Sequence, residues 1–238
     1  MTQTLSPTPP PAGTPLVPEP SPAPSPAPGP AGSPTDLGVG ARLSLHPMTD
    51  DFAEVILAAL AAGDTARLTV ATDDVSTFVR GTEADVTRYL RDVIAAAAST
   101  GVHTVAHVLL SRGCPGEVRC EVGDDLMLRA VAAPRVELTG LTASAHWALY
   151  PLDDGGPDAF GGERPRDHMA GIYAAIDRAR DLGTLTRSEH FVTRLDGDLA
   201  DVLATVAEGW LLVGRTVRHV TSHVTIALHS PSTAEVDR

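Results

Sequence analysis

The chain has 238 residues, a formal net charge of −12, and 18 basic residues that are all arginine. An acidic surface argues against a nucleic-acid partner, whose phosphates require a basic stripe, and is compatible with a cationic small ligand. No run of about eighteen apolar residues occurs, so we expect no insertion into a membrane. The two cysteines, Cys114 and Cys120, are too few to stabilise the chain through disulfide bonds, and we expect a reduced, cytoplasmic protein.

Residues 1–36 form a leader rich in proline and alanine, with thirteen of the twenty prolines of the chain. Such a composition cannot build a hydrophobic core, so it predicts a disordered spacer with polyproline II character. The leader has neither the basic segment nor the continuous apolar segment of a secretory signal. The alternative is an arm that docks a partner domain, although alternating proline and alanine without flanking arginine is weak evidence for that role.

The rest of the chain is an internal duplication. Residues 55–116 align with residues 171–232 at a constant offset of 116 positions and without a gap. Upstream, residues 43–48 resemble residues 147–152 at an offset of 104, so a twelve-residue insertion falls in the glycine- and proline-rich stretch 153–167, which predicts a surface loop. We therefore expect two domains of similar size, at 37–135 and 136–238.

In the first copy, alternation of apolar and polar residues over 42–46 predicts a strand that ends at Pro47. Apolar residues at helical spacing from Phe52 to Leu60 predict a helix that ends at Gly63. Two short extended segments suited to a hairpin follow, at 66–71 and 75–80.

Thr82 is expected to cap a second helix, whose buried stripe runs from Val86 to Ile94, and a last strand is predicted over 103–111. The second copy repeats these elements, with strands at 145–150, near Leu185, at 191–195 and at 217–228, and with helices at 168–182 and 198–213. The order βαββαβ, found twice, predicts an α+β protein of two tandem ferredoxin-like repeats with antiparallel sheets. Because one face of such a sheet stays uncovered, we expect the repeats to stack on each other or two chains to stack as a homodimer.

Four histidines recur in the two copies, His103 and His107 as His219 and His223. Within one strand, four residues separate two side chains by roughly 13 Å, which is too far for one metal ion. His103 meets His219 if the two terminal strands face each other. The interpretation we favour is partly buried histidines that bond to neighbours on a sheet, and we expect no metal site.

Two further groups have a structural and a chemical interpretation. Cys114 lies in a Gly-Cys-Pro-Gly turn where a nucleophile could stand, but the second copy has Ser230 there, which favours a structural turn. Asp73 and Asp74 are either solvated carboxylates of a turn or an anchor for an amine or a cation. No phosphate-binding loop, nucleophile elbow or catalytic triad pattern occurs, so nothing in the sequence compels an enzyme.

Thr77 and Thr193 are equivalent threonines in the third strand of each copy. A hydroxyl both donates and accepts hydrogen bonds, and the third strand is adjacent to the first in this fold. A flat heteroaromatic ring beside the first strand could bond the backbone of Leu45 or Leu149 and this threonine. Threonine is also a common strand residue, so a purely structural role is an equal alternative.

Several motifs together resemble the YkoF family of thiamine- and hydroxymethylpyrimidine-binding proteins: Ser44–Met48, Asp73–Gly81, Ser111–Gly116, Ala148–Pro151, Leu195–Asp198 and Ser230–Ser232. The resemblance implies a cytosolic, non-catalytic and usually dimeric protein that needs no cofactor and supports uptake of thiamine or its pyrimidine by an ABC-type transporter. It also implies one aminopyrimidine site per repeat, with Leu45 and Thr77 in the first and Leu149 and Thr193 in the second. The copies differ around these residues, which predicts unequal affinities. Two alternatives are a structural adaptor that recruits a partner through its proline-rich arm and a small enzyme that uses the histidines with Cys114.

Overall fold

A computed structural model describes residues 38–113, 132–152 and 168–232, apart from positions 216 and 218. The proline-rich leader, both cysteines and the inserted stretch 153–167 lie outside the described residues, and the predictions about them stay predictions.

Each repeat has the predicted βαββαβ order. The first contains β1 (Gly40–Pro47), α1 (Phe52–Ala62), β2 (Thr69–Thr72), β3 (Thr77–Arg80), α2 (Glu83–Ala98) and β4 (Thr104–Arg112). The second contains β5 (Thr142–Leu152), α3 (His168–Asp181), β6 (Leu185–Ser188), β7 (Thr193–Asp198), α4 (Leu199–Val213) and β8 (His219–Leu228). The prediction of two ferredoxin-like repeats is confirmed.

The helix ends follow from local chemistry. Gly63 ends α1, and its backbone N–H donates to the carbonyl oxygen of Leu60. The hydroxyl of Thr82 accepts from the backbone N–H of Asp85 and so caps α2, as predicted. At the matching position of the second repeat, the carboxylate of Asp198 caps α4.

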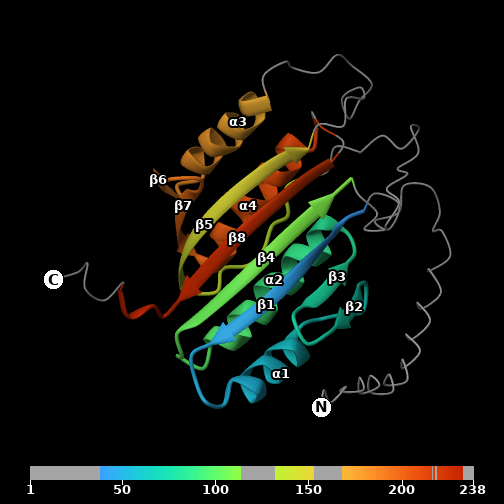
Figure 1. The fold of residues 1–238 in the computed structure, drawn as a ribbon, viewed down its shortest axis with the longest axis vertical. Coiled ribbons are helices and arrows are strands. Elements are labelled where there is room, and N and C mark those ends of the chain that lie inside the picture. Colours follow the sequence, from blue (N-terminus) through green and yellow to red (C-terminus); the bar gives the residue numbers. More distant parts are fainter. Residues whose placement is uncertain (1–37, 114–131, 153–167, 216, 218, 233–238) are drawn as a thin grey trace, which may run out of the picture.

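The two repeats share one eight-stranded sheet, in the order β2-β3-β1-β4-β8-β5-β7-β6. Its halves join edge to edge through β4 and β8, which lie side by side in the middle of Figure 1. The expectation that the repeats stack face to face within one chain is therefore wrong. Both terminal strands are long and would otherwise expose an unpaired edge, and pairing them satisfies the backbone groups of both.

The register of this junction makes the two repeats symmetric. Val108 lies opposite Val224, and these two residues occupy equivalent positions of the two repeats. A local two-fold axis therefore passes through the sheet between them. A residue near Val108 in the first repeat therefore lies close to its equivalent, which is near Val224 in the second repeat.

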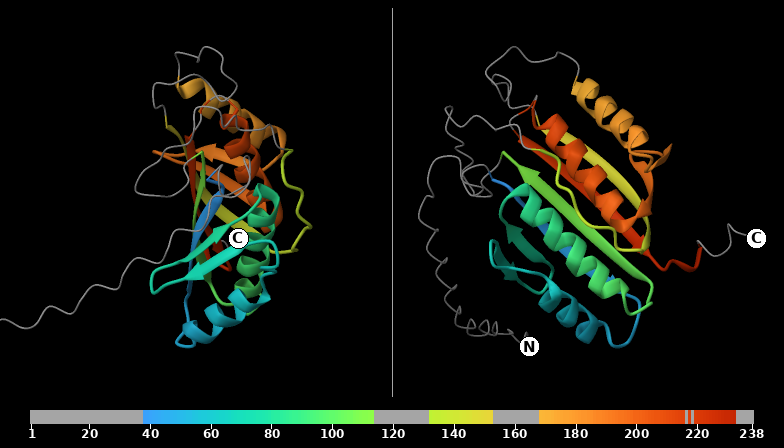
Figure 2. Two further views of the ribbon diagram at one scale, coloured as in Figure 1. Left: turned by 90° about the vertical axis from the view of Figure 1, so that its right-hand side faces the viewer. Right: turned by 180° about the vertical axis from the view of Figure 1, so that it is seen from behind.

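All four helices lie on one side of the sheet (Figure 2), and α2 and α4 contact each other across the middle. The core lies between this layer and the sheet and includes the fully buried Tyr89 and Trp210. Trp147 of β5 is also buried, and its indole N–H donates to the hydroxyl of Ser222 at 2.8 Å. The opposite face of the sheet carries no helix within the described part of the chain.

Candidate functional site

Strand β1 continues past the end of its neighbour β3. Their pairing ends with Leu43 opposite Thr77, whereas β1 stays paired with β4 up to its own end. The backbone N–H of Met48 donates to the carbonyl oxygen of His103 at 2.9 Å, so the even-numbered residues of β1 are those that exchange hydrogen bonds with β4. The backbone N–H and C=O of Leu45 therefore point to the β3 side, one rung beyond the last pair.

Strand β5 repeats this arrangement beside β7. The last pair is Trp147 opposite Thr193. Here the backbone N–H of Leu199 donates to the carbonyl oxygen of Leu141 at 2.9 Å, which assigns the odd-numbered residues of β5 to the bonds with β7. The backbone groups of Leu149 thus point to the β7 side, again one rung beyond the end of the ladder.

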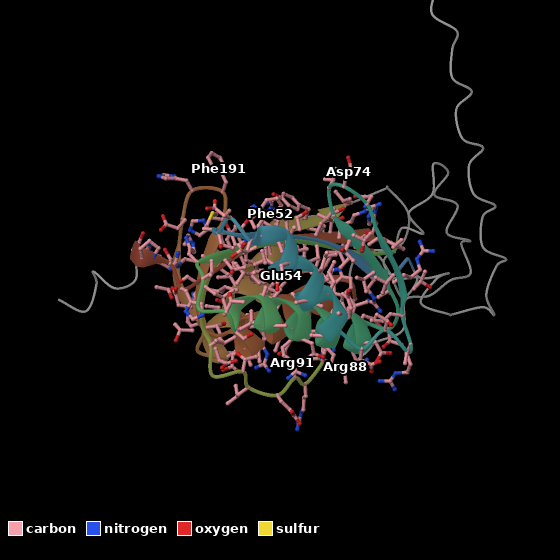
Figure 3. The ribbon with its side chains drawn as sticks, turned by 90° about the horizontal axis from the view of Figure 1, so that it is seen from below. Phe52, Glu54, Asp74, Arg88, Arg91 and Phe191 are labelled. Carbon is pink, nitrogen blue, oxygen red and sulfur yellow. The ribbon has the colours of Figure 1, made fainter. Side chains whose placement is uncertain are left out.

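Both hairpins close with the same backbone hydrogen bond. The N–H of Asp73 donates to the carbonyl oxygen of Ser76 at 3.0 Å, and the equivalent N–H of Glu189 donates to Val192 at 2.9 Å. The two hairpin tips project to the side of the sheet away from the helices (Figures 2 and 3). Because the tips leave the plane of the sheet, they do not extend β3 and β7 along the neighbouring strand.

In the first repeat, side chains of β1 hold the hairpin tip on the open face. Arg42 donates to the carboxylate of Asp73 at 2.7 Å, and the hydroxyl of Ser44 donates to the carbonyl oxygen of Val75 at 3.0 Å. Asp73 also accepts from the backbone N–H groups of Ser76 and Val75. Hydrogen bonds from Ser76, Arg42 and Val75 lower the pKa of Asp73 to about 2. These bonds hold the hairpin tip in the geometry that leaves the backbone N–H and C=O of Leu45 without a strand partner on the β3 side.

The four predicted site residues are buried on the helix-covered side of the sheet: Leu45 is 8% exposed, Thr77 3%, Leu149 8% and Thr193 7%. The hydroxyl of Thr77 lies 3.0 Å from that of Thr72, its partner on β2, and Ser188 is the partner of Thr193 on β6. Each repeat therefore brings together an open backbone rung and a threonine hydroxyl. This combination can bind a flat ring that presents a donor beside an acceptor.

Large exposed apolar side chains occur at equivalent positions of the two repeats. Val75 and Phe191, one rung past the threonines, are 76% and 98% exposed. Leu57 on α1 and Tyr173 on α3 form a second equivalent pair of exposed side chains. The sequence predicts strands over 75–80 and 191–195, which include both residues, and does not predict their exposure. Their position directly after the polar residues of each turn is the sequence feature that could have predicted this exposure.

The histidine contacts run between strands. His103 precedes β4 and His219 begins β8, so the antiparallel pairing places them at opposite ends of the junction and excludes the alternative in which they meet. Instead the imidazoles of His107 and His223 stack, with ring centroids 6.1 Å apart. The ring of His46 lies 5.2 Å from that of His107. All three lie on the open face and outside the two strand-edge sites.

The Nδ1 atom of His107 lies 2.9 Å from the hydroxyl of Thr225. Burial lowers the pKa of His107, as do the neighbouring imidazoles of His46 and His223. A neutral imidazole is therefore favoured at this position.

Asp73 serves the hairpin turn, because its carboxylate oxygens bond the turn backbone and Arg42. Asp74 is exposed and points outward at the tip (Figure 3), so the two carboxylates do not form a paired anchor. Cys114 lies outside the described residues. Among the residues that the structure describes, no three side chains of His, Cys, Asp or Glu are arranged to hold a metal ion. Within the same ranges, no helix is long and apolar enough to cross a membrane.

The fold and the two matched strand edges define a class of protein: two tandem ferredoxin-like repeats with one candidate small-ligand site in each. The chain matches the model of the YKOF-related family over residues 38–117 and 142–233. It is also 33% identical over 196 residues to the Bacillus subtilis (strain 168) protein named "Putative HMP/thiamine-binding protein YkoF". That alignment covers 81% of this chain and 91% of the Bacillus protein. The chain therefore belongs to the YkoF-related family.

Proposed function

We propose that this protein binds thiamine or its hydroxymethylpyrimidine moiety without catalysis, one molecule at each strand edge. The observation that carries the proposal is the repeated open rung at Leu45 and Leu149, each next to a buried threonine. An aminopyrimidine presents a ring nitrogen that accepts and an exocyclic amine that donates. This pair matches the N–H and C=O of one strand residue in the way an added strand would.

The class of ligand is further supported by the name of the Bacillus relative, which refers to HMP and thiamine. The net charge of −12 favours a cation such as thiamine over a phosphorylated form. The side chains around the two rungs differ, with Val75 in one repeat and Phe191 in the other, so the two affinities are unequal.

The family resemblance supports a cytoplasmic role in the uptake or homeostasis of thiamine or its pyrimidine, with components of an ABC-type transporter as partners. The helix-free sheet face supports a homodimer as the working form, since such faces are normally covered.

Titration calorimetry with hydroxymethylpyrimidine, thiamine and thiamine diphosphate tests the binding proposal. Thr77→Val and Thr193→Val should each weaken one site by roughly 5- to 150-fold, because an unpaired polar group costs about 1–3 kcal/mol. Thr87→Val is the matched control, since Thr87 is buried in α2 and its hydroxyl donates to the carbonyl oxygen of Glu83. Equal weakening by all three variants, or no heat with any ligand, would contradict the proposal.

A further inference from the structure

The hairpin tip of the second repeat carries a phenylalanine in an unusual setting. The side chain of Phe191 is 98% exposed, and its backbone has a φ of 67°, in the left-handed region. Bulky residues rarely adopt this conformation, which glycine or asparagine adopts at a lower energetic cost. The combination of a strained backbone and a solvent-exposed aromatic ring points to a function for this side chain.

The register of the sheet places Phe191 beside the open rung of its repeat. The pairing of β7 with β5 ends with Thr193 opposite Trp147, so the position opposite Leu149 belongs to Phe191, two residues before Thr193. The chain leaves the sheet at this position, and the tip projects to the side away from the helices (Figure 3). The Cα atoms of Phe191 and Thr193 are at most about 7.6 Å apart, so the phenyl ring is within reach of a ligand in the rung.

The two hairpin tips are held differently. In the first repeat, the hydroxyl of Ser44 donates to the carbonyl oxygen of Val75 at 3.0 Å and connects the tip to β1. The equivalent residues of the second repeat are Ala148 and Phe191, and alanine has no hydroxyl that could donate this bond. The ring of Phe191 can therefore adjust to a ligand in a way that Val75 cannot.

A ligand in the second rung has room only on the side of the sheet where this tip stands. Leu149 and Thr193 are buried on the helix-covered side, so a bulky substituent on a bound pyrimidine must extend away from the helices. Thiamine carries such a substituent, a cationic thiazolium ring that a methylene group joins to the pyrimidine. A cation above the face of an aromatic ring is attracted by the negative charge density of that face.

The charges of the hairpin permit a cation beside Phe191. Its two arginines are both paired, Arg187 with Glu189 and Arg194 with Asp196. The hydrogen bond and the charge of Arg187 lower the pKa of Glu189, so this carboxylate is ionised near neutral pH. The hairpin therefore opposes a cationic ring with no excess of positive charge from its arginines.

We propose that Phe191 makes the second site selective for thiamine over the free pyrimidine, because its ring covers the thiazolium when the pyrimidine fills the rung at Leu149. The inference rests on the proposed function and adds a specificity-determining residue to one of its two sites. Val75, the equivalent residue of the first repeat, offers no aromatic face. The first site therefore binds thiamine and the free pyrimidine with more similar affinities than the second.

Calorimetry on single-site variants, with circular dichroism to verify folding, tests this proposal. In a Thr77→Val background, the second site is measured with thiamine, with hydroxymethylpyrimidine and with a thiamine analogue in which a neutral thiophene replaces the thiazolium. Adding Phe191→Leu should weaken the binding of thiamine about 2- to 30-fold and leave the two uncharged ligands within about twofold, because only the thiazolium interacts with the aromatic face as a cation.

Two further variants control for the position and for the turn. Val75→Leu, at the equivalent position of the first repeat, should leave all three affinities of the second site unchanged. Phe191→Asn suits the left-handed backbone and removes the ring, so it should give the same loss of thiamine affinity as Phe191→Leu. Thiamine affinity retained in Phe191→Asn would overturn the role of the ring.

The remaining outcomes separate this inference from the proposed function. Equal weakening of thiamine and of its neutral analogue by Phe191→Leu, or no weakening of either, overturns the selectivity and leaves binding at the rung standing. Unchanged affinities together with a changed sedimentation coefficient assign Phe191 to an interface between chains and overturn the inference as well. No heat with any of the three ligands overturns the proposed function itself.

Discussion

One buried ion pair in the first repeat corresponds to two leucines in the second. Arg112, the last residue of β4, is 1% exposed and donates from Nε to the carboxylate of Glu83, the first residue of α2, at 2.9 Å. The equivalent positions in the second repeat are Leu199 and Leu228, which are both fully buried. The two repeats therefore fill the same two buried positions, once with charges and once with apolar side chains.

Replacing Arg112 alone with leucine leaves the Glu83 carboxylate buried without its cation. Burial lowers the pKa of Arg112, and the Glu83 carboxylate opposes that effect. Breaking a buried pair from one side costs about 3–5 kcal/mol, whereas replacing both partners by apolar residues is often neutral. We expect Arg112→Leu to lower the free energy of unfolding by about 3–5 kcal/mol and the melting temperature by roughly 6–20 °C.

The double variant Glu83→Leu with Arg112→Leu should recover most of this loss. Recovery should be incomplete, because Nη1 of Arg112 packs closely against Gly214: a Cβ atom added to this glycine would lie 2.7 Å from Nη1. A leucine at position 112 is too short to fill that space and leaves a cavity. Urea unfolding followed by circular dichroism measures the three free energies. Arg180→Leu, which breaks the exposed pair with Asp177, is the control and should cost no more than about 1 kcal/mol. A single variant as stable as the wild type, or a double variant no better than the single, would refute the reasoning.

Three further predictions concern the second repeat. Ser222→Ala leaves the buried indole N–H of Trp147 unpaired and should cost about 1–3 kcal/mol in urea unfolding; no loss would contradict it. Gly209→Ala places a Cβ atom 2.4 Å from the Trp147 ring. The cost of this overpacking, about 1–3 kcal/mol, should exceed the gain of about 1 kcal/mol in helix propensity, so the variant should be less stable than the wild type. A raised melting temperature would contradict this prediction. Burial opposes ionisation of Asp198, but hydrogen bonds from Thr139, Ala200 and Gly140 outweigh burial and lower the pKa of Asp198. The contribution of this carboxylate to the free energy of unfolding is therefore complete above the unfolded pKa, near 3.9. That contribution is lost as the pH falls through the folded pKa. Asp198→Ala should therefore cost about 1–2 kcal/mol near pH 7 and less near pH 3, and a difference independent of pH would exclude this origin.

Local signals predicted the elements well, because their causes are local. Gly63 and Thr82 mark helix ends through hydrogen bonds within a few residues, and both predictions are confirmed. In the first repeat, β3 begins at Thr77, two residues later than predicted, because residues 75 and 76 donate their backbone N–H groups to the side chain of Asp73 instead of a neighbouring strand. A turn carboxylate at the end of a short strand is a recognisable signal, and it also accounts for the open rung at Leu45.

The junction between the repeats could not be predicted from local patterns. The pairing of β4 with β8 joins residues more than one hundred positions apart, and periodicity says which face a strand buries but not which strand it pairs with. The contact between His107 and His223 depends on that junction, because the two residues meet only through it. Four residues along one strand keep His103 and His107 apart, and the ring contacts of His107 run across strands instead.

The central claim is that a ligand occupies the open backbone rung in each repeat. Nuclear magnetic resonance of amide-labelled protein titrated with hydroxymethylpyrimidine tests it most directly. The backbone amides of Leu45 and Leu149 should shift in two saturable steps of unequal affinity, and Thr77→Val and Thr193→Val should each weaken one step. Shifts confined to the open face around His107 and His223, with Leu45 and Leu149 unchanged at saturation, would contradict it.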